Sequence, residues 1–131
     1  MGRSISTTLT DSERRIMDVL WKLKEASVRT VVEELSKHRP HAYTTVLTMF
    51  KILEKKGLVT YRQEGRAFIY KPAISRGEAR RKALENLLMQ FFNGSPDILA
   101  QHLISEHQID PTELQALRDK VSAAPGKEDQ T

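Results

Sequence analysis

The chain has 131 residues, of which 39% are hydrophobic, carries a formal net charge of +4 and contains no cysteine. The lack of cysteine excludes disulfides, zinc–thiolate sites, cysteine nucleophiles and thiol-based redox sensors, and no apolar run approaches the about 20 residues of a membrane-spanning helix. We therefore expect one ordinary domain or two small ones, in a soluble cytoplasmic protein that does not associate with a membrane.

The positive charge is confined to the first half of the chain. Residues 1–74 carry a net charge of +6, whereas residues 75–131 carry −2. A basic surface attracts polyanions such as nucleic acid. The charge distribution therefore places nucleic-acid binding in the first half and gives the second half another role.

The first predicted helix begins with a capping box. Residues 1–8 are polar and we expect them to be disordered. Thr10 and Glu13 have the capping-box spacing, which predicts a helix that runs to about Lys24. Trp21 flanks the apolar stripe of this helix, so we expect it in the core or at the seam between domains.

A second, shorter helix is expected before a proline. Ser27 is a good N-cap for a helix over about 28–37. The Arg39-Pro40 step then breaks the chain, because the residue before proline avoids helical angles. This connection separates the second helix from the third.

The third predicted helix, within His41–Gly57, has two different faces on a helical wheel. Its apolar face carries Val46, Met49, Phe50 and Leu53. Its opposite face carries hydroxyl and ammonium groups, on Thr44, Thr48, Lys51 and Lys55. An ordinary surface helix fits this pattern, and so does a helix that docks on a domain and presses its polar face into an anionic groove.

After Gly57 the hydrophobic period changes from 3.6 to 2, which predicts a β-hairpin of residues 58–62 and 66–71. We expect the turn at 63–65, with Arg62 and Arg66 flanking the tip. Three helices followed by a basic hairpin is the order of a winged helix-turn-helix, in which the second helix of the motif enters the major groove.

The aromatic residues of the hairpin allow two interpretations. Tyr61, Phe68 and Tyr70 could stack on bases, as in proteins that bind single strands. They could instead pack the hairpin onto the domain. We expect at least two of them to pack against the first and third helices.

The second half of the chain predicts three helices, over about 76–93, 96–107 and 111–123, followed by a disordered tail, 124–131. Roughly 45 residues bury too little surface for an independent domain, so the apolar positions need a partner. The simplest partner is a second copy in a twofold dimer. The proposed dimerisation residues are Leu84, Leu87, Leu88, Phe91, Leu103, Leu114 and Leu117.

Metal binding and catalysis find little support in the sequence. The pairs His38/His41 and His102/His107 have no third ligand at a useful spacing, so we expect no metal site and no cofactor. His41 is better interpreted as a cap or a phosphate neighbour of the third helix. No Gly-rich phosphate loop, Gly-x-Ser-x-Gly or His-Glu-x-x-His motif is present, so we expect no enzyme.

From about Leu9 to Leu117 the chain resembles the penicillinase-repressor (BlaI/MecI) family of bacterial transcription repressors. The resembling segments are LTDSERRIMDVLW, SVRTVVEEL, AYTTVLTMFKILEKKGLV, GRAFIYKP, SRGEARRKAL and DPTELQALR. The resemblance implies a mainly α fold with a small β-hairpin: a winged helix-turn-helix domain at 9–74 and a three-helix dimerisation domain at 75–123. It also implies a homodimer that binds a palindromic double-stranded DNA operator and represses transcription, in many relatives of genes for β-lactam resistance.

The resemblance makes the third helix the recognition helix. The base-facing candidates are then Tyr43, Thr44, Thr45 and Thr48, since threonine offers a hydroxyl and a methyl to base edges. The phosphate candidates are Arg39, His41, Lys51, Arg62 and Arg66, with Lys55 weaker because it lies far along the helix.

Two departures limit the resemblance. The resistance repressors are cleaved at an Asn-Phe bond by a regulatory protease pathway, and the corresponding bond here is His102-Leu103. Copper-responsive relatives carry cysteine pairs, which this chain lacks, so that branch is excluded. The alternative function is a winged-helix module for protein–protein interaction without specific DNA binding.

Overall fold

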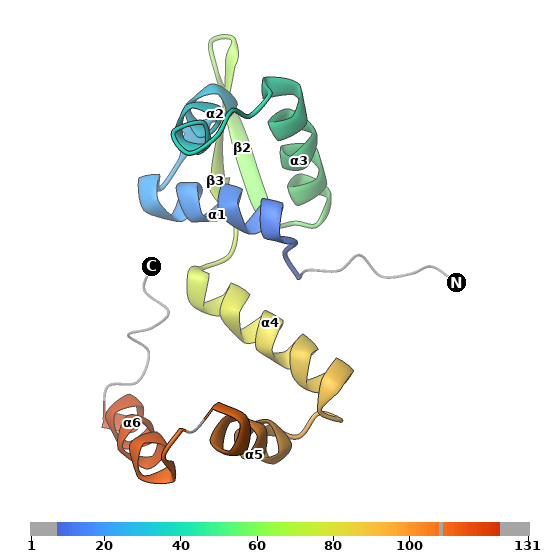
Figure 1. Cartoon of the computed structure of the whole chain (residues 1–131). Coiled ribbons are helices and arrows are strands. Elements are labelled where there is room, and N and C mark those ends of the chain that lie inside the picture. The colour runs from blue at the N-terminus through green and yellow to red at the C-terminus, as the bar shows by residue number, and fades with distance from the viewer. Residues whose placement is uncertain (1–7, 108, 124–131) are drawn as a thin grey trace.

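The computed structural model describes residues 8–107 and 109–123, so the expected disordered ends lie outside the described residues apart from Thr8. The fold is mainly α-helical with one β-hairpin, and its elements follow one another in the expected order (Figure 1). The elements are α1 (Asp11–Leu23), β1 (Ala26–Ser27), α2 (Val28–Leu35), α3 (Tyr43–Lys55), β2 (Val59–Glu64), β3 (Ala67–Pro72), α4 (Arg76–Phe91), α5 (Pro96–His107) and α6 (Pro111–Ala123).

Local capping explains where the helices begin. The Thr10/Glu13 capping box is present: the Glu13 amide donates to Thr10 Oγ1 at 3.2 Å, and the Thr10 amide donates to Glu13 Oε1 at 3.0 Å. Ser27 caps α2 as expected. Ser75 and Glu78 form a second capping box at the start of α4, which the sequence reasoning missed.

Two helices end earlier than expected. The second was predicted to Lys37, but α2 ends at Leu35 because the amides of Lys37 and His38 bond three residues back instead of four, at 3.3 and 3.4 Å. The fourth was predicted to about residue 93, but α4 ends at Phe91. The amide of Gly94 donates to the carbonyl of Leu88 at 2.7 Å, and its φ of +72° is one that glycine adopts without strain.

The hairpin belongs to a three-stranded antiparallel sheet with the order β1-β3-β2. β1 was not predicted, because two residues are too few to show an alternating pattern. Glu64 pairs with Ala67, so the turn is Gly65-Arg66 rather than the predicted 63–65. Gly65 takes φ +61° at the first turn position, which suits a two-residue hairpin loop.

The hydrophobic core lies in the first half of the chain. The helices α1–α3 and the sheet bury their apolar faces against one another, whereas no hydrophobic residue of α4–α6 is buried among the described residues. The buried hydrophobic residues are Ile16, Met17, Leu20, Trp21, Ala26, Val28, Val31, Val46, Phe50, Leu53, Leu58, Val59 and Tyr70.

Only one of the three hairpin aromatic residues is buried. Tyr70, on the central strand, packs on Phe50 of α3 with ring centroids 4.3 Å apart. Tyr61 lies on the edge strand and Phe68 nearer the tip, and they are 47% and 42% exposed. The expectation that at least two would pack against the helices is therefore wrong, because only Tyr70 is buried.

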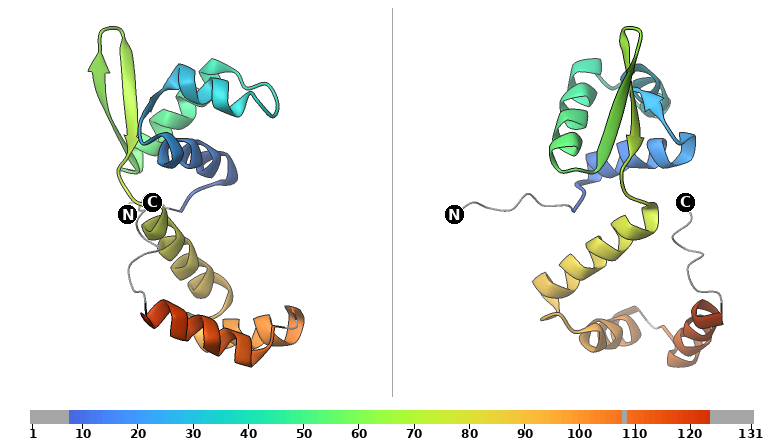
Figure 2. Two further views of the ribbon diagram at one scale, coloured as in Figure 1. Left: turned by 90° about the vertical axis from the view of Figure 1, so that its left-hand side faces the viewer. Right: turned by 180° about the vertical axis from the view of Figure 1, so that it is seen from behind.

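Trp21 joins the first half of the chain to α4, as expected of a residue at the seam. Its indole N–H donates to the carbonyl oxygen of Ile74 at 2.9 Å, and its side chain is buried. The guanidinium of Arg76 lies 4.8 Å from the ring centroid. Beyond this seam, α4 leads to α5 and α6, which lie away from α1–α3 and the sheet (Figure 2).

Candidate nucleic-acid interface

The exposed face of α3 carries the side chains that the sequence selected. Val46, Phe50 and Leu53 are buried and Met49 is partly buried, which confirms the predicted apolar face. Within the described residues, Lys51 forms no hydrogen bond or ion pair. The exposed side chains of α3 include Tyr43, Thr44, Thr45, Thr48, Lys51 and Lys55.

The three threonines of α3 are not equivalent. The hydroxyl of Thr48 donates to the carbonyl oxygen of Thr44 at 3.0 Å, so its proton is already used within the helix. Its oxygen can still accept, and its methyl can contact a thymine methyl. The hydroxyls of Thr44 and Thr45 make no hydrogen bond among the described residues, so they can either donate or accept.

The start of α3 has no side-chain cap. Its N-cap is Ala42, and no side chain accepts from the first amides. The expectation that His41 caps this helix is wrong, because its Nδ1 instead lies 2.8 Å from the carbonyl oxygen of Arg39. The first amides of α3 are therefore open to an anion such as a phosphate oxygen.

The two hairpin arginines lie in different environments. Arg66, in the turn, is exposed and forms no ion pair with any described residue. Arg62 is held by two carboxylates: Glu25 accepts at 2.7 and 2.9 Å, and Glu64 accepts at 2.7 and 3.0 Å. The hydrogen bond to Glu25 is the main cause of a raised pKa at Arg62 and of a lowered pKa at Glu25. Arg62 must release these partners before it can bind a phosphate.

A groove of about 400 Å³ lies between the hairpin and the helices α2 and α3. Arg66 and Phe68 line it from the hairpin, Tyr43 from α3 and Arg29 from α2. The groove combines two cations with two aromatic rings, a combination that suits a sugar–phosphate strand. The sequence reasoning missed Arg29, because its place in this groove depends on the contact between α2 and a hairpin that lies more than 30 residues further along the chain.

Arg39 and His41 lie in a second cleft, lined by side chains of α1, α2 and the connection to α3. Asp18 and Glu34 also line this cleft, so it is less positive than its cations alone imply. The predicted phosphate residues therefore form separate groups: Arg66 near Tyr43, and Arg39 with His41 closer to α1.

Lys56 fixes the end of α3 to the start of α1. Its ammonium lies 2.7 Å from Glu13 Oε1, and both side chains are nearly buried, at 13% and 6% exposed. Burial raises the pKa of Glu13, but hydrogen bonds from Lys56 and Thr10 outweigh burial and leave it below its ordinary value. The pairing of Lys56 with Glu13 was not predicted from the sequence, because the two residues are 43 positions apart.

Neither a cluster of possible metal ligands nor a membrane-spanning helix is found among the described residues. They contain no group of three or more His, Cys, Asp or Glu side chains that could hold an ion. None of the described helices has the length and apolar character needed to cross a bilayer.

The family model and the curated relatives that match this chain point to the same family. The family model described as "Penicillinase repressor" matches residues 9–123. The penicillinase repressor of Bacillus licheniformis is 29% identical over 109 residues, which cover 83% of this chain and 85% of the relative. The transcriptional regulator BlaI of Mycobacterium tuberculosis is 38% identical over 114 residues, which cover 86% and 81%.

Solved structures agree on the fold. The DNA-binding domain of the repressor BlaI, determined in solution, has a TM-score of 0.51 and 34% identity, and covers 59% of this chain and 93% of its own. A complex structure of hsRosR-S4 has a TM-score of 0.52 with 18% identity, and covers 89% and 94%. At that identity the second likeness concerns the fold alone.

Proposed function

The chain belongs to the penicillinase repressor family, a family of transcriptional repressors rather than enzymes, and on that premise we propose that it is a dimeric repressor of a palindromic operator. The proposal includes a cytoplasmic location, where bacterial promoters lie. It assigns base recognition to α3 and dimerisation to α4–α6.

The observation that carries the proposal is the exposed face of α3. Hydroxyl and methyl groups stand at its N-terminal end, and the ammonium of Lys51 follows one turn later. An α-helix fits the major groove, where threonine can address base edges and lysine the backbone. We assign base readout to Tyr43, Thr44, Thr45 and Thr48.

Phosphate contacts would fix the position of α3 on the duplex. We assign this role to Arg66, to Arg39 and His41 beside α3, and to Lys51. Arg29 joins this group because it lines the same groove as Arg66. Arg62 belongs to this group only when its ion pairs with Glu25 and Glu64 are broken.

Exposed apolar side chains support the proposed dimer. Phe91 is 71% exposed, Leu117 57% and Leu84 45%. Removing apolar side chains of this kind from water is favourable and would stabilise the protein. Pairing of two chains through α4–α6 would cover them, together with Leu87, Leu88, Leu103 and Leu114. Two linked recognition helices then bind a palindrome much more tightly than one.

The target genes are part of the proposal. Relatives include regulators named for penicillinase and for methicillin resistance, so we propose a β-lactamase or related stress operon as the target. The resemblance aligns the family's Asn-Phe cleavage bond with His102-Leu103, and these two residues lie within α5. A gene for a membrane metalloprotease sensor beside the gene of this chain would support release by a regulatory protease.

Competitive binding tests the proposal. Genomic promoter fragments are titrated with the full chain against random DNA at ~0.15 M salt, where specific complexes usually exceed nonspecific ones by about 10³ or more. Thr44→Ala and Arg66→Ala should weaken the preferred complex, whereas the matched control Arg118→Ala, on α6, should not. If no fragment exceeds random DNA and the α3 and hairpin variants change nothing, the chain is a protein-interaction module instead.

A further inference from the structure

A cleft of about 300 Å³ lies at the seam between α1 and α4, away from the groove beside α3. The apolar part of its lining comes from Leu9, Trp21, Ala79 and Ala83. Small-molecule sites in proteins combine such apolar walls with a few convergent polar groups. The seam cleft therefore has the size and the apolar part of a site for a small ligand.

The polar part of the seam cleft is mainly cationic. Arg14, Arg76 and Arg80 line it, against a single carboxylate, Asp18. Asp18 accepts from Arg14 on one oxygen and from Arg76 on the other, both at 2.9 Å. Among the residues that line the cleft, three guanidinium groups therefore face one carboxylate.

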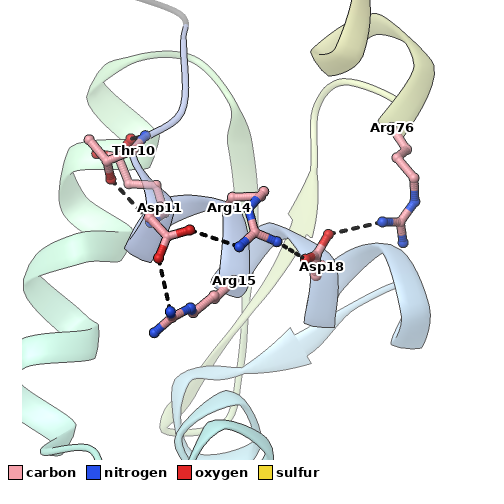
Figure 3. Close-up of polar contacts among 7 residues, drawn as sticks. Thr10, Asp11, Arg14, Arg15, Asp18 and Arg76 are labelled. Carbon is pink, nitrogen blue, oxygen red and sulfur yellow. Dashed lines mark hydrogen bonds and ion pairs between the residues drawn. The ribbon is translucent and has the colours of Figure 1, made fainter. Parts of the chain in front are cut away.

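Figure 3 shows that these contacts form a chain of alternating charges along α1 that ends on α4. Its last cation is Arg76, which among the described residues donates only through Nη1, to Asp18. The Nε and Nη2 donors of Arg76 have no partner there. A guanidinium with two such donors matches a second carboxylate in the planar, two-bond geometry.

We propose that the seam cleft binds a small carboxylate with an apolar tail, the carboxylate on Arg76 and its cationic neighbours and the tail along Trp21 and Ala83. Because Arg76 also ties α4 to α1 through its Nη1 bond to Asp18, such a ligand binds directly at the link between the two halves. It would thereby change the spacing of the two recognition helices in a dimer. This regulatory step rests on the proposed function; ligand binding itself does not.

Trp21 provides the reporter, because it is the only tryptophan of the chain and it lines the cleft. Octanoate is titrated into the full chain while the indole emission is followed. We expect a saturable change with a Kd of about 1 mM or tighter, as for a ligand of about ten heavy atoms. Acetate, which lacks the tail, and 1-octanol, which lacks the carboxylate, should bind more weakly by about tenfold. A response that does not saturate, or one that octanol reproduces, overturns the proposal.

Two variants separate the site from general effects of charge. Arg76→Gln should weaken octanoate binding by about tenfold, whereas Arg81→Gln, which removes the same charge from α4 outside the cleft, should leave it within about twofold. Equal effects of the two variants would refute the role of Arg76.

Ala83→Phe fills the cleft without removing an ion pair, and should abolish the response while the circular dichroism spectrum is retained; unchanged binding would place the ligand elsewhere.

The regulatory step has its own readout. Saturating octanoate should lower the affinity for the preferred promoter fragment by about fivefold or more, a usual size of coupling between sites. If octanoate binds without changing the affinity for DNA, the coupling is refuted, but the proposed binding site is not. If no fragment is bound specifically, the proposed function fails, and the tryptophan titration still decides whether the site exists.

Discussion

The buried ion pair between Lys56 and Glu13 allows a sharp test of how α3 is held. Lys56→Met removes the ammonium but keeps most of the side-chain volume, so it leaves a buried carboxylate without its charged partner. The two atoms are 2.7 Å apart, and both side chains are shielded from water. A loss of stability should therefore follow, with loosening of α3 at its C-terminal end.

The size of the loss can be estimated. Removing one partner of a buried pair costs about 3–5 kcal/mol. The low end, about 3 kcal/mol, applies here because Glu13 keeps its hydrogen bond from the amide of Thr10. For a domain of this size, about 1 kcal/mol shifts Tm by about 4–8 °C, so Tm should fall by about 12–24 °C.

Thermal and urea unfolding followed by circular dichroism measure this loss. The matched control is Lys55→Met, the same substitution at an exposed neighbour, which should change stability by no more than about 0.5 kcal/mol. Adding Glu13→Gln to Lys56→Met should recover part of the loss, since glutamine keeps the capping box without a charge. Equal effects of Lys55→Met and Lys56→Met would refute the reasoning.

The pair also predicts a pH dependence. The pKa of Glu13 is below its ordinary value of 4.5 in the folded chain, so the unfolded chain binds the proton more readily. Its contribution to stability is therefore complete above about pH 4.5 and is lost as the pH falls through the lowered pKa. Lys56→Met should show a smaller loss between pH 5 and pH 3 than the wild type; an unchanged profile would contradict the assignment.

Four further predictions concern DNA binding and assembly. Leu87→Asp places a charge in the proposed dimer face and should convert the dimer to a monomer in sedimentation; an unchanged dimer would exclude that face. Arg66→Ala should weaken binding to all sequences alike and reduce the slope of log K against log salt by about one unit; a change in sequence preference would contradict its phosphate role. Thr45→Ala should change discrimination at one operator position by about 1–3 kcal/mol in competition assays, and uniform weakening would refute base contact. Glu25→Gln combined with Glu64→Gln should free Arg62 and steepen the salt dependence; no change would show that Arg62 does not face phosphate.

Sequence reasoning succeeded where the signal was local. The cap at Thr10 and the start of α2 at Ser27 depend on residues within one turn, so their spacing could be read directly. The apolar face of α3 followed from its period, and the buried positions agree with it. Trp21 at the seam followed from a large ring at the edge of an apolar stripe.

Features that join distant parts of the chain could not be predicted. Glu25 and Arg62 are 37 positions apart, and nothing in either segment marks the other as its partner. The pairing depends on β1, which places the loop after α1 beside the hairpin, and β1 itself has no sequence signature. For the same reason Arg62 and Arg66 looked alike in the sequence but differ in their availability to phosphate.

Hydroxyl-radical footprinting on the best-bound promoter fragment tests the central claim most directly. A dimer that inserts one α3 into each half of a palindrome should protect both strands in two patches related by a dyad, with centres separated by about 10–10.5 base pairs or a multiple of that spacing. Protection should disappear when Thr44 and Thr45 are both replaced by alanine. A single patch without symmetry, or protection no stronger than on random DNA, would contradict recognition of an operator by paired α3 helices.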